Sequence, residues 1–248
     1  MKILHLDIET SPHKVYAWGL WGQDISLNQI VETGSTLCWA AKWHGKKGIM
    51  FDSEHKSSHE HMIERIWQLI DSADAVCHYN GTKFDMPTLN KEFLKYDLMP
   101  PSGYHEIDLL RTARRKFRLA SNKLDFVAQF LGEGEKVKHM GMDLWTQCMA
   151  GDDSAWRIME KYNKQDVALL ERVYLRLLPW IEHHPNHALY TNTFHPVCRY
   201  CGSQNLKKNG TETTTVGVYQ RWRCNDCKSN LKGRYNMHPQ QHRQAVLK

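Results

Sequence analysis

The chain has 248 residues, 41% hydrophobic and 24% charged, a composition typical of a soluble globular protein. No apolar run approaches the ~20 residues of a membrane span, so we expect no membrane partner. The length allows one sizeable domain and a small second one. The start of the chain meets an acidic residue too early for a signal peptide, so we expect a cytoplasmic location and reduced or metal-bound cysteines.

Charge is distributed unevenly along the chain. Residues 189–248 carry ten Lys and Arg against two Asp and Glu, whereas residues 1–188 carry 23 basic and 25 acidic residues. A basic tail on a nearly neutral body predicts a polyanionic partner, most often nucleic acid. A basic surface that is merely solvated explains this composition equally well.

Strand patterns dominate the first part of the chain. The apolar run at 3–10 predicts a core strand, and alternation over 37–43 predicts a second. A turn at 44–48 then leads into a third strand at 49–51. A further short buried strand is predicted at 75–79.

Helix patterns separate and follow these strands. Ser57 and Glu60 have capping-box spacing, and an apolar stripe over 62–70 follows them. Pro87 fits the first turn of another helix through Leu94.

Two more helices are predicted further along the chain. The first covers residues 124–131 and is stopped by Gly132. The second is capped by Asp153 or Ser154 and reaches about Leu178, either continuous or broken near Tyr162. The basic run at 111–118 suits phosphate contacts or an amphipathic helix surface equally well.

The order of these elements predicts an α/β domain with a mixed sheet flanked by helices. Pro179 and the segment 183–187 end this body and suggest a linker. We therefore predict a large domain, a linker and a small basic domain, over residues 1–182, 183–190 and 191–248.

Four carboxylates and a tyrosine recur in buried-looking contexts. Asp7 and Glu9 share one face of the first strand, because strand residues two apart point the same way. Asp85 ends a loop after a predicted strand, and Tyr162 and Asp166 share one side of a helix. Buried carboxylates repel one another unless a cation lies between them, and divalent metal ions usually supply that cation.

Two-metal phosphoryl transfer is the chemistry that needs such a set. Two Mg²⁺ (or Mn²⁺) ions activate a water and stabilise the leaving oxygen, and both metals prefer oxygen ligands. A tyrosine beside the site orients the attacking water. Each motif alone is common by chance, but their joint occurrence on the expected elements is a strong signal.

These motifs resemble those of the DEDD superfamily of 3′–5′ exonucleases, and the tyrosine of the third motif resembles its DEDDy branch. The middle motif, residues 80–85, is most similar to the proofreading domain of family-B DNA polymerases. The resemblance covers roughly residues 1–180 and implies a ribonuclease-H-like fold. It also implies that the metal ligands are Asp7, Glu9, Asp85 and Asp166. By the same resemblance Tyr162 positions the attacking water, and Asn80 and Phe84 contact the substrate.

The resemblance has one departure, since only about 60 residues follow the predicted linker and no polymerase domain is among them. We expect a stand-alone 3′–5′ exonuclease or a subunit, acting on single-stranded DNA. A 3′–5′ exoribonuclease uses the same carboxylates, and no motif reveals a contact to the 2′-hydroxyl. A non-catalytic nucleic-acid-binding protein and an endonuclease of flaps or junctions are further alternatives.

Two Cys-x-x-Cys knuckles lie in the basic tail, at Cys198 and Cys201 and at Cys224 and Cys227. Four thiolates at this spacing predict one structural Zn²⁺ in a small Cys₄ zinc ribbon. His195 is a less favoured substitute ligand. The spacer predicts a hairpin with two arms around a central glycine, namely residues 213–216, 218–222 and Gly217. Basic and aromatic residues there suit a nucleic-acid strand, and a protein partner is the alternative.

The remaining histidines, cysteines and tryptophans point less clearly to function. A solvated surface is favoured for His44, His55, His59 and His61. Buried structural thiols are favoured for Cys38, Cys77 and Cys148. Core packing is favoured for Trp39 and Trp43, whereas base stacking stays open for Trp18 and Trp21.

Overall fold

The computed structural model describes residues 1–136 and 140–239. The chain divides into two compact units. The larger unit is Lys2–Tyr174, and the smaller unit is Leu175–Lys248 together with Met1. This division does not test the predicted domain boundaries, which stay a prediction.

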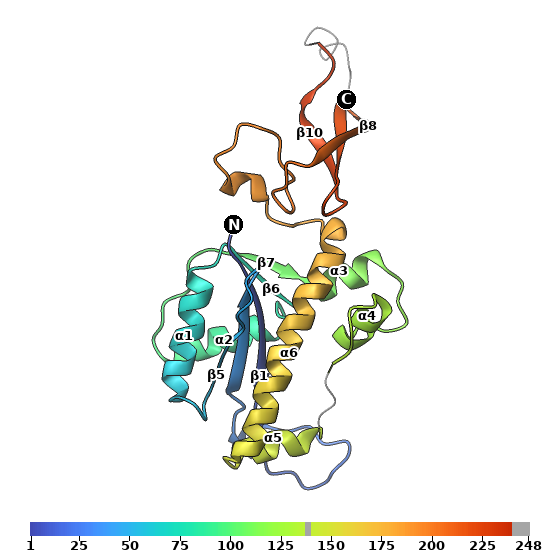
Figure 1. Ribbon diagram of the computed structural model, residues 1–248. Coiled ribbons are helices and arrows are strands. Elements are labelled where there is room, and N and C mark those ends of the chain that lie inside the picture. Colours follow the sequence, from blue (N-terminus) through green and yellow to red (C-terminus); the bar gives the residue numbers. More distant parts are fainter. Residues whose placement is uncertain (137–139, 240–248) are drawn as a thin grey trace. The chain divides into compact units, whose positions relative to one another are not determined.

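The larger unit is built on a five-stranded mixed sheet with the strand order β5-β4-β1-β6-β7 (Figure 1). β1 pairs antiparallel with β4 and parallel with β6, so the central strand joins the two halves of the sheet. The strands are β1 Ile3–Thr10, β4 Thr36–Trp43, β5 Met50–Ser53, β6 Ala75–His78 and β7 His105–Asp108. Four of these confirm the predicted strands, and only β7 was not anticipated.

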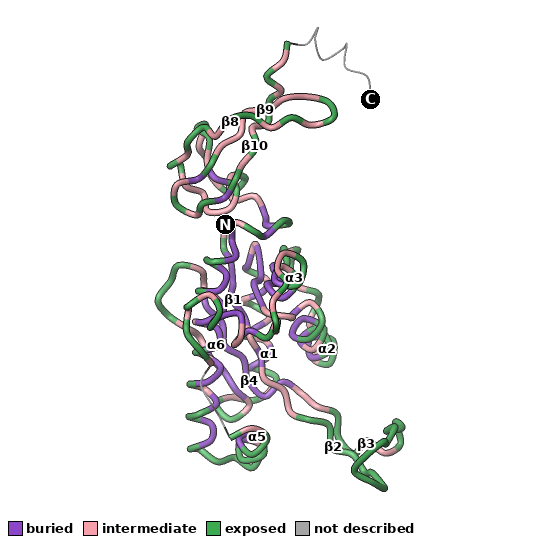
Figure 2. The backbone as a smooth tube through the Cα atoms, turned by 90° about the vertical axis from the view of Figure 1, so that its right-hand side faces the viewer, coloured by how far each residue is buried: buried purple, intermediate pink, exposed green. Residues whose placement is uncertain are grey.

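Helices cover both faces of this sheet, which confirms the predicted α/β class (Figure 1). One core cluster joins apolar side chains of β1 and β4 to α1 and α2, and another joins the opposite face of β4 to α5 and α6. β4 is therefore buried on both faces rather than on alternate residues (Figure 2). The helices are α1 His59–Asp71, α2 Asp85–Lys95, α3 Leu109–Lys116, α4 Leu124–Phe130, α5 Met142–Met149 and α6 Asp153–Leu177.

One detail of the helix predictions needs correction, and the structure decides one that was left open. The N-cap of α1 is Ser58, whose hydroxyl accepts the His61 N–H at 3.2 Å, and not Ser57. Ser57 is unavailable because its hydroxyl donates to Asp52 Oδ1 at 2.9 Å. α6 is continuous through Tyr162, because the apolar stripe of the helix packs against β4 without interruption.

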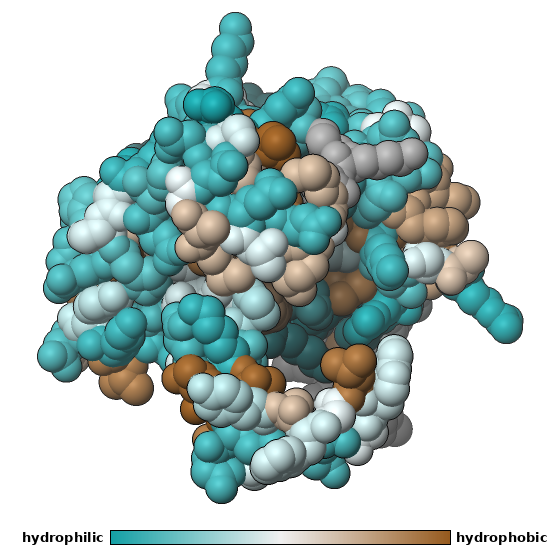
Figure 3. All heavy atoms as spheres, turned by 90° about the horizontal axis from the view of Figure 1, so that it is seen from below, coloured by the Kyte–Doolittle hydropathy of each residue, from teal (hydrophilic) through white to brown (hydrophobic). Residues whose placement is uncertain are grey.

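A long excursion between β1 and β4 contains the short strands β2 Lys14–Val15 and β3 Ile30–Glu32, with η1 Leu27–Gln29 between them (Figure 2). It exposes several large apolar side chains, among them Trp18 at 98% and Trp21 at 87% exposure. A space-filling view shows hydrophobic side chains on a projecting loop at its lower edge (Figure 3). By contrast, Trp39 is fully buried, as predicted.

The smaller unit contains a three-stranded antiparallel sheet with the order β10-β9-β8. Its strands are β8 Leu206–Thr214, β9 Gly217–Cys224 and β10 Asn230–Asn236, preceded by the short turns η2 Leu178–Trp180 and η3 His187–Tyr190. Thr214 faces Gly217, so the hairpin turns at 215–216 and Gly217 begins the second arm instead of marking the centre. Among the described residues, no helix is both long and apolar enough to cross a membrane.

Candidate active site

The edge of β1 positions the first carboxylates. β1 pairs with β6 only at Ile3–His5, so its later residues lack a strand partner on that side. Asp85, the first residue of α2, fills part of this gap, since its Oδ1 accepts the Ile8 N–H at 3.3 Å. Ile8 lies between Asp7 and Glu9, and the hydrogen bond therefore brings the middle motif to the first.

α6 brings the third motif to the same strand. The side-chain amide of Asn163 donates to Asp7 Oδ2 at 2.7 Å and lies 3.4 Å from the Asp7 carbonyl oxygen. Asn163 is fully buried. Tyr162 directly precedes Asn163, and Asp166 follows it by three residues. Both are buried as well. Asn163 thus holds α6 in register with β1.

The carboxylates converge on one point. One oxygen each from Asp7, Glu9 and Asp166 lies within 4.8 Å of the others. Lys136 is the cation beside them: its ammonium group donates to Asp166 Oδ2 and lies 3.4 Å from the Tyr162 hydroxyl oxygen. The same Nζ is 5.4 Å from the centre of the Tyr162 ring.

Burial and mutual repulsion make these carboxyl groups weak acids. The pKa of Asp7 is raised well above its usual value by burial and by the charges of Glu9, Asp85 and Asp166. Burial also raises the pKa of Glu9 to about 8, although Lys136 opposes the shift. The pKa of Asp85 rises to about 6 through burial, opposed by nearby His78 and the Ile8 N–H.

Such a set fits a divalent cation. Mg²⁺ and Mn²⁺ take carboxylate oxygens and keep several waters. Their charge would remove the repulsion that now favours protonation of Asp7 and Glu9. The donor set and its electrostatics therefore match the group that the sequence predicts, with Asp7, Glu9 and Asp166 as holders and Asp85 beside them.

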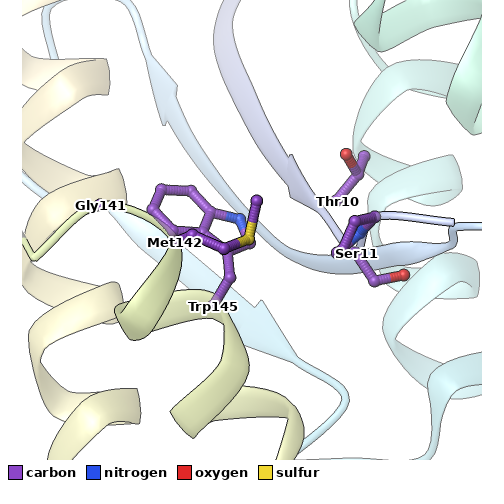
Figure 4. A pocket seen from close by; sticks show the side chains of 6 residues that line it. Thr10, Ser11, Gly141, Met142 and Trp145 are labelled. Carbon is purple, nitrogen blue, oxygen red and sulfur yellow. The ribbon is translucent and has the colours of Figure 1, made fainter. Parts of the chain in front are cut away.

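Two cavities adjoin this cluster. The larger, of about 460 Å³, is lined by Asp7 and Lys136 together with two further basic side chains, Arg114 and Lys123. The smaller, of about 320 Å³, lies between the end of β1 and the start of α5. In Figure 4, Met142 and Trp145 face Thr10 and Ser11 across it. Of these two cavities in the described part of the chain, the larger contains Asp7 of the carboxylate cluster, whereas the lining of the smaller includes no carboxylate.

The turn between β6 and α2 contains the two predicted substrate residues. Asn80 has a left-handed backbone with φ of 73°, and its N–H donates to Asp108 Oδ1 at 3.0 Å. Phe84 is 46% exposed. Neither residue belongs to the carboxylate cluster that brings Asp7, Glu9 and Asp166 together. Their role in substrate binding stays a prediction.

A buried histidine organises this turn. His78 is fully buried, its Nδ1 accepts the Gly81 N–H at 3.1 Å, and its Nε2 lies 3.3 Å from Glu106 Oε2. A Cβ atom on Gly81 would lie 2.3 Å from the imidazole ring. Only glycine fits there, which explains the glycine of the middle motif.

Sequence reasoning missed two residues of the site. Asn163 could have been found from the sequence, because it is an amide on the apolar stripe of α6. The buried Met159 and Val167 lie four residues before and after it. Lys136 had no such signal, since it lies in the segment between α4 and α5 where no periodic pattern singles it out.

The four knuckle cysteines also converge. Their sulfur atoms all lie within 4.8 Å of one another, with Cys198–Cys227 at 3.5 Å and Cys201–Cys224 at 3.7 Å. A disulfide would place two sulfurs about 2.05 Å apart. Tetrahedral Zn²⁺ with bonds of about 2.3 Å places neighbouring sulfurs about 3.8 Å apart. The cluster is consistent with a small zinc-binding module, whereas the three other cysteines are buried separately, as predicted.

The larger unit contains another polar cluster, formed by His5, His44 and Glu171. Its own hydrogen bonds hold it together. His5 Nε2 lies 3.2 Å from His44 Nδ1, and Glu171 accepts from Lys42 and from the Gly45 N–H. Burial lowers the pKa of His5 to about 3, so its ring is neutral. His44 therefore belongs to a structural network, which corrects the expectation that it is a solvated surface residue.

Comparison with known proteins identifies the fold. Residues 4–178 match the sequence profile of a family described as the RNase H superfamily. The chain belongs to the RNase H superfamily. No curated protein matches it. The RNase H superfamily assignment agrees with the mixed sheet flanked by helices, and it covers all five residues of the predicted catalytic set.

A solved structure supports the same fold. The family B DNA polymerase from the hyperthermophilic archaeon Pyrobaculum calidifontis is similar over 72% of this chain, with a TM-score of 0.53 and 16% sequence identity. The similar region spans only 24% of the polymerase chain. At this identity the likeness concerns the RNase H superfamily fold and not the activity.

Proposed function

We propose that the larger unit is a metal-dependent 3′–5′ exonuclease that hydrolyses phosphodiester bonds of single-stranded DNA. One observation supports this most: oxygens of Asp7, Glu9 and Asp166, from two distant segments, lie within 4.8 Å of one another in a member of the RNase H superfamily. Keeping so many carboxylates close together is unfavourable unless a cation is bound between them. The 3′–5′ direction rests on the DEDDy motif resemblance.

In this proposal each residue has a distinct role. Asp7, Glu9, Asp85 and Asp166 hold two Mg²⁺ or Mn²⁺ ions, which supply charge stabilisation at the attacking and leaving oxygens when bound. The Tyr162 hydroxyl orients the attacking water. Burial and the nearby carboxylates raise the pKa of Tyr162, so the hydroxyl stays protonated and can hydrogen-bond a water. Asn163 is a positioning residue, because it acts through Asp7.

The surroundings of the site suit a phosphate chain. Arg114, Lys123 and Lys136 line the cavity that contains Asp7, and basic side chains there would neutralise phosphates. Asn80 and Phe84 are proposed to line the path of the strand. A 2′-hydroxyl contact would decide between DNA and RNA, and the experiment below therefore includes both.

The smaller unit is proposed to hold one structural Zn²⁺ through Cys198, Cys201, Cys224 and Cys227. The sulfur separations of 3.5 and 3.7 Å support this, because they match the edges of a tetrahedral thiolate site. We propose that the exonuclease domain covers residues 1–182, the linker residues 183–190, and the zinc ribbon with its basic tail residues 191–248.

The deciding experiment incubates the full-length protein and Mg²⁺ with DNA and RNA oligonucleotides labelled at either end. We expect a ladder shortening from the 3′ end of single-stranded DNA. The Asp7→Asn variant is the matched control, since it removes one charge at nearly constant volume and should leave no ladder. Release from the 5′ end, internal cuts, or equal activity of the variant would contradict the proposal.

A further inference from the structure

One face of the sheet in the smaller unit collects positive charge. Arg221 and Arg223 are two residues apart on β9, so their side chains share a face. Lys207 of β8 lies opposite Arg223, and Lys232 of β10 lies opposite Arg221. We call these four residues the basic face.

The basic face places like charges directly opposite each other. Neighbouring strands lie about 4.8 Å apart, and like charges at facing positions destabilise a sheet. Lys207 and Arg223 are both exposed. Within residues 1–136 and 140–239, no carboxylate pairs with either of them, whereas Lys232 pairs with Glu212 at 3.3 Å. A polyanion bound across the strands would relieve the repulsion.

An aromatic ring lies on the same face. Tyr219 precedes Arg221 by two residues on β9, and Lys232 Nζ is 5.5 Å from the centre of its ring. The Tyr219 ring is partly exposed. Cations beside such a ring suit a strand whose bases are unpaired, because such bases can stack while the phosphates are neutralised. Paired bases in a duplex are stacked on each other and cannot reach the ring in this way.

We propose that the basic face binds the phosphate backbone of a single-stranded nucleic acid, with Tyr219 as a stacking platform. This rests on the proposed function only in taking nucleic acid as the partner of the chain. It gives the protein a second strand contact, in a unit that contains none of the proposed catalytic residues.

The test measures the affinity of full-length protein for oligo(dT), for the matching RNA and for duplex DNA across a salt series. All proteins carry Asp166→Asn, so that the strand is not cleaved and no chelator endangers the zinc. Lys207→Gln combined with Arg223→Gln is compared with Lys46→Gln combined with Lys47→Gln. The control pair changes the net charge equally but lies in an exposed turn of the larger unit.

We expect the salt slope for single strands to become shallower by about 0.7 for each lost phosphate contact, hence about 1.4 for the basic-face pair. The control pair should leave the slope unchanged. A protein with Lys207→Arg and Arg223→Gln should have a slope between those of the basic-face pair and the control pair. DNA and RNA should lose slope equally if only phosphates are contacted, and a loss for RNA alone would overturn the phosphate-backbone assignment.

Two further results would overturn the inference. An unchanged slope in the basic-face variant, with its zinc retained, would assign this charge to a protein partner. An equal loss for duplex DNA would remove the single-strand assignment. Should the pair disturb zinc binding, Lys232→Gln alone provides the same readout from another strand. If the proposed nuclease function is wrong, the protein with Asp166 intact will not cleave the strand. That result is independent of the salt slopes.

Discussion

At the residue scale, Tyr162 and Asp166 lie one helical turn apart, and a carboxylate oxygen of Asp166 belongs to the cluster. We predict that Tyr162→Phe slows hydrolysis about a hundredfold while metal affinity changes little. In the proposed role the hydroxyl orients water, and its loss removes one hydrogen bond without removing a charge. Single-turnover rates and Mn²⁺ titration measure the two quantities.

Tyr174→Phe is the matched control for this prediction. It removes the same hydroxyl from the same helix, where the ring packs against His5 and His44 instead of the carboxylates. Its turnover should stay near that of the unchanged protein. A comparable loss of metal affinity and rate in Tyr162→Phe would show that the tyrosine supports the structure of the site.

The raised pKa of Glu9 predicts how stability depends on pH. In the folded, metal-free protein Glu9 keeps its proton up to about pH 8, whereas the unfolded chain loses it near 4.5. Between these values the folded state binds more protons, so the free energy of unfolding falls as pH rises. Melting temperature against pH should show this decline.

Two additions to that measurement identify the source of the decline. Saturating Mg²⁺ should flatten the curve, because the metal replaces the protons, and Glu9→Gln should flatten it without metal. A decline of the same size in Glu9→Gln would assign the pH dependence to other groups.

At the element scale, the turn between β6 and α2 depends on close packing. Gly81→Ala would force a Cβ atom to within 2.3 Å of the His78 ring. We predict a loss of about 1–3 kcal/mol in the free energy of unfolding, together with reduced turnover, because Asp85 begins the helix that follows. Denaturant unfolding and turnover of the same preparation provide the measurements.

Gly103→Ala is the control, since nothing lies within 4 Å of the added carbon. It should leave both stability and turnover nearly unchanged. Equal stability of the two variants would mean that the turn can shift to accept a side chain.

Elements with a clear apolar pattern were predictable, whereas weakly patterned or contact-dependent features were not. β1 and α6 combine length with a clear apolar pattern, and both were placed from the sequence. β7 has two exposed residues among its four, and α5 buries only Leu144 and Cys148, so neither had an extended apolar pattern to detect. The caps depend on tertiary contacts: Ser57 has the right spacing, but its hydroxyl binds Asp52.

The same distinction applies to the candidate site. The motif residues are recognisable because residue type and spacing carry the chemistry. Lys136 reaches Asp166 across 30 positions and Asn163 reaches Asp7 across 156. Such contacts depend on how the helices pack on the sheet, and the local sequence does not encode them directly.

At the scale of the whole molecule, the smaller unit should depend on its metal. We predict one tightly held zinc per chain, and loss of that zinc in Cys224→Ser. The strands of this unit are largely exposed, so the thiolate site supplies much of its folding free energy. Metal analysis and limited proteolysis should show cleavage after about residue 190 in the variant, while the larger unit remains intact.

Cys148→Ala is the control for this prediction. It removes a buried thiol from the larger unit, outside the four-cysteine cluster, and should leave the zinc content at one. A Cys224→Ser protein that keeps both its zinc and its protease resistance would show that the cluster is not the zinc site.

The long reach between β1 and α6 also matters during synthesis of the chain. Asp7 and Glu9 leave the ribosome well before the helix that completes their cluster, because Asn163 of that helix follows Asp7 by 156 positions. Domains fold as units once their parts are available. A growing chain therefore lacks an assembled carboxylate centre until α6 has emerged, and the proposed activity cannot begin before then.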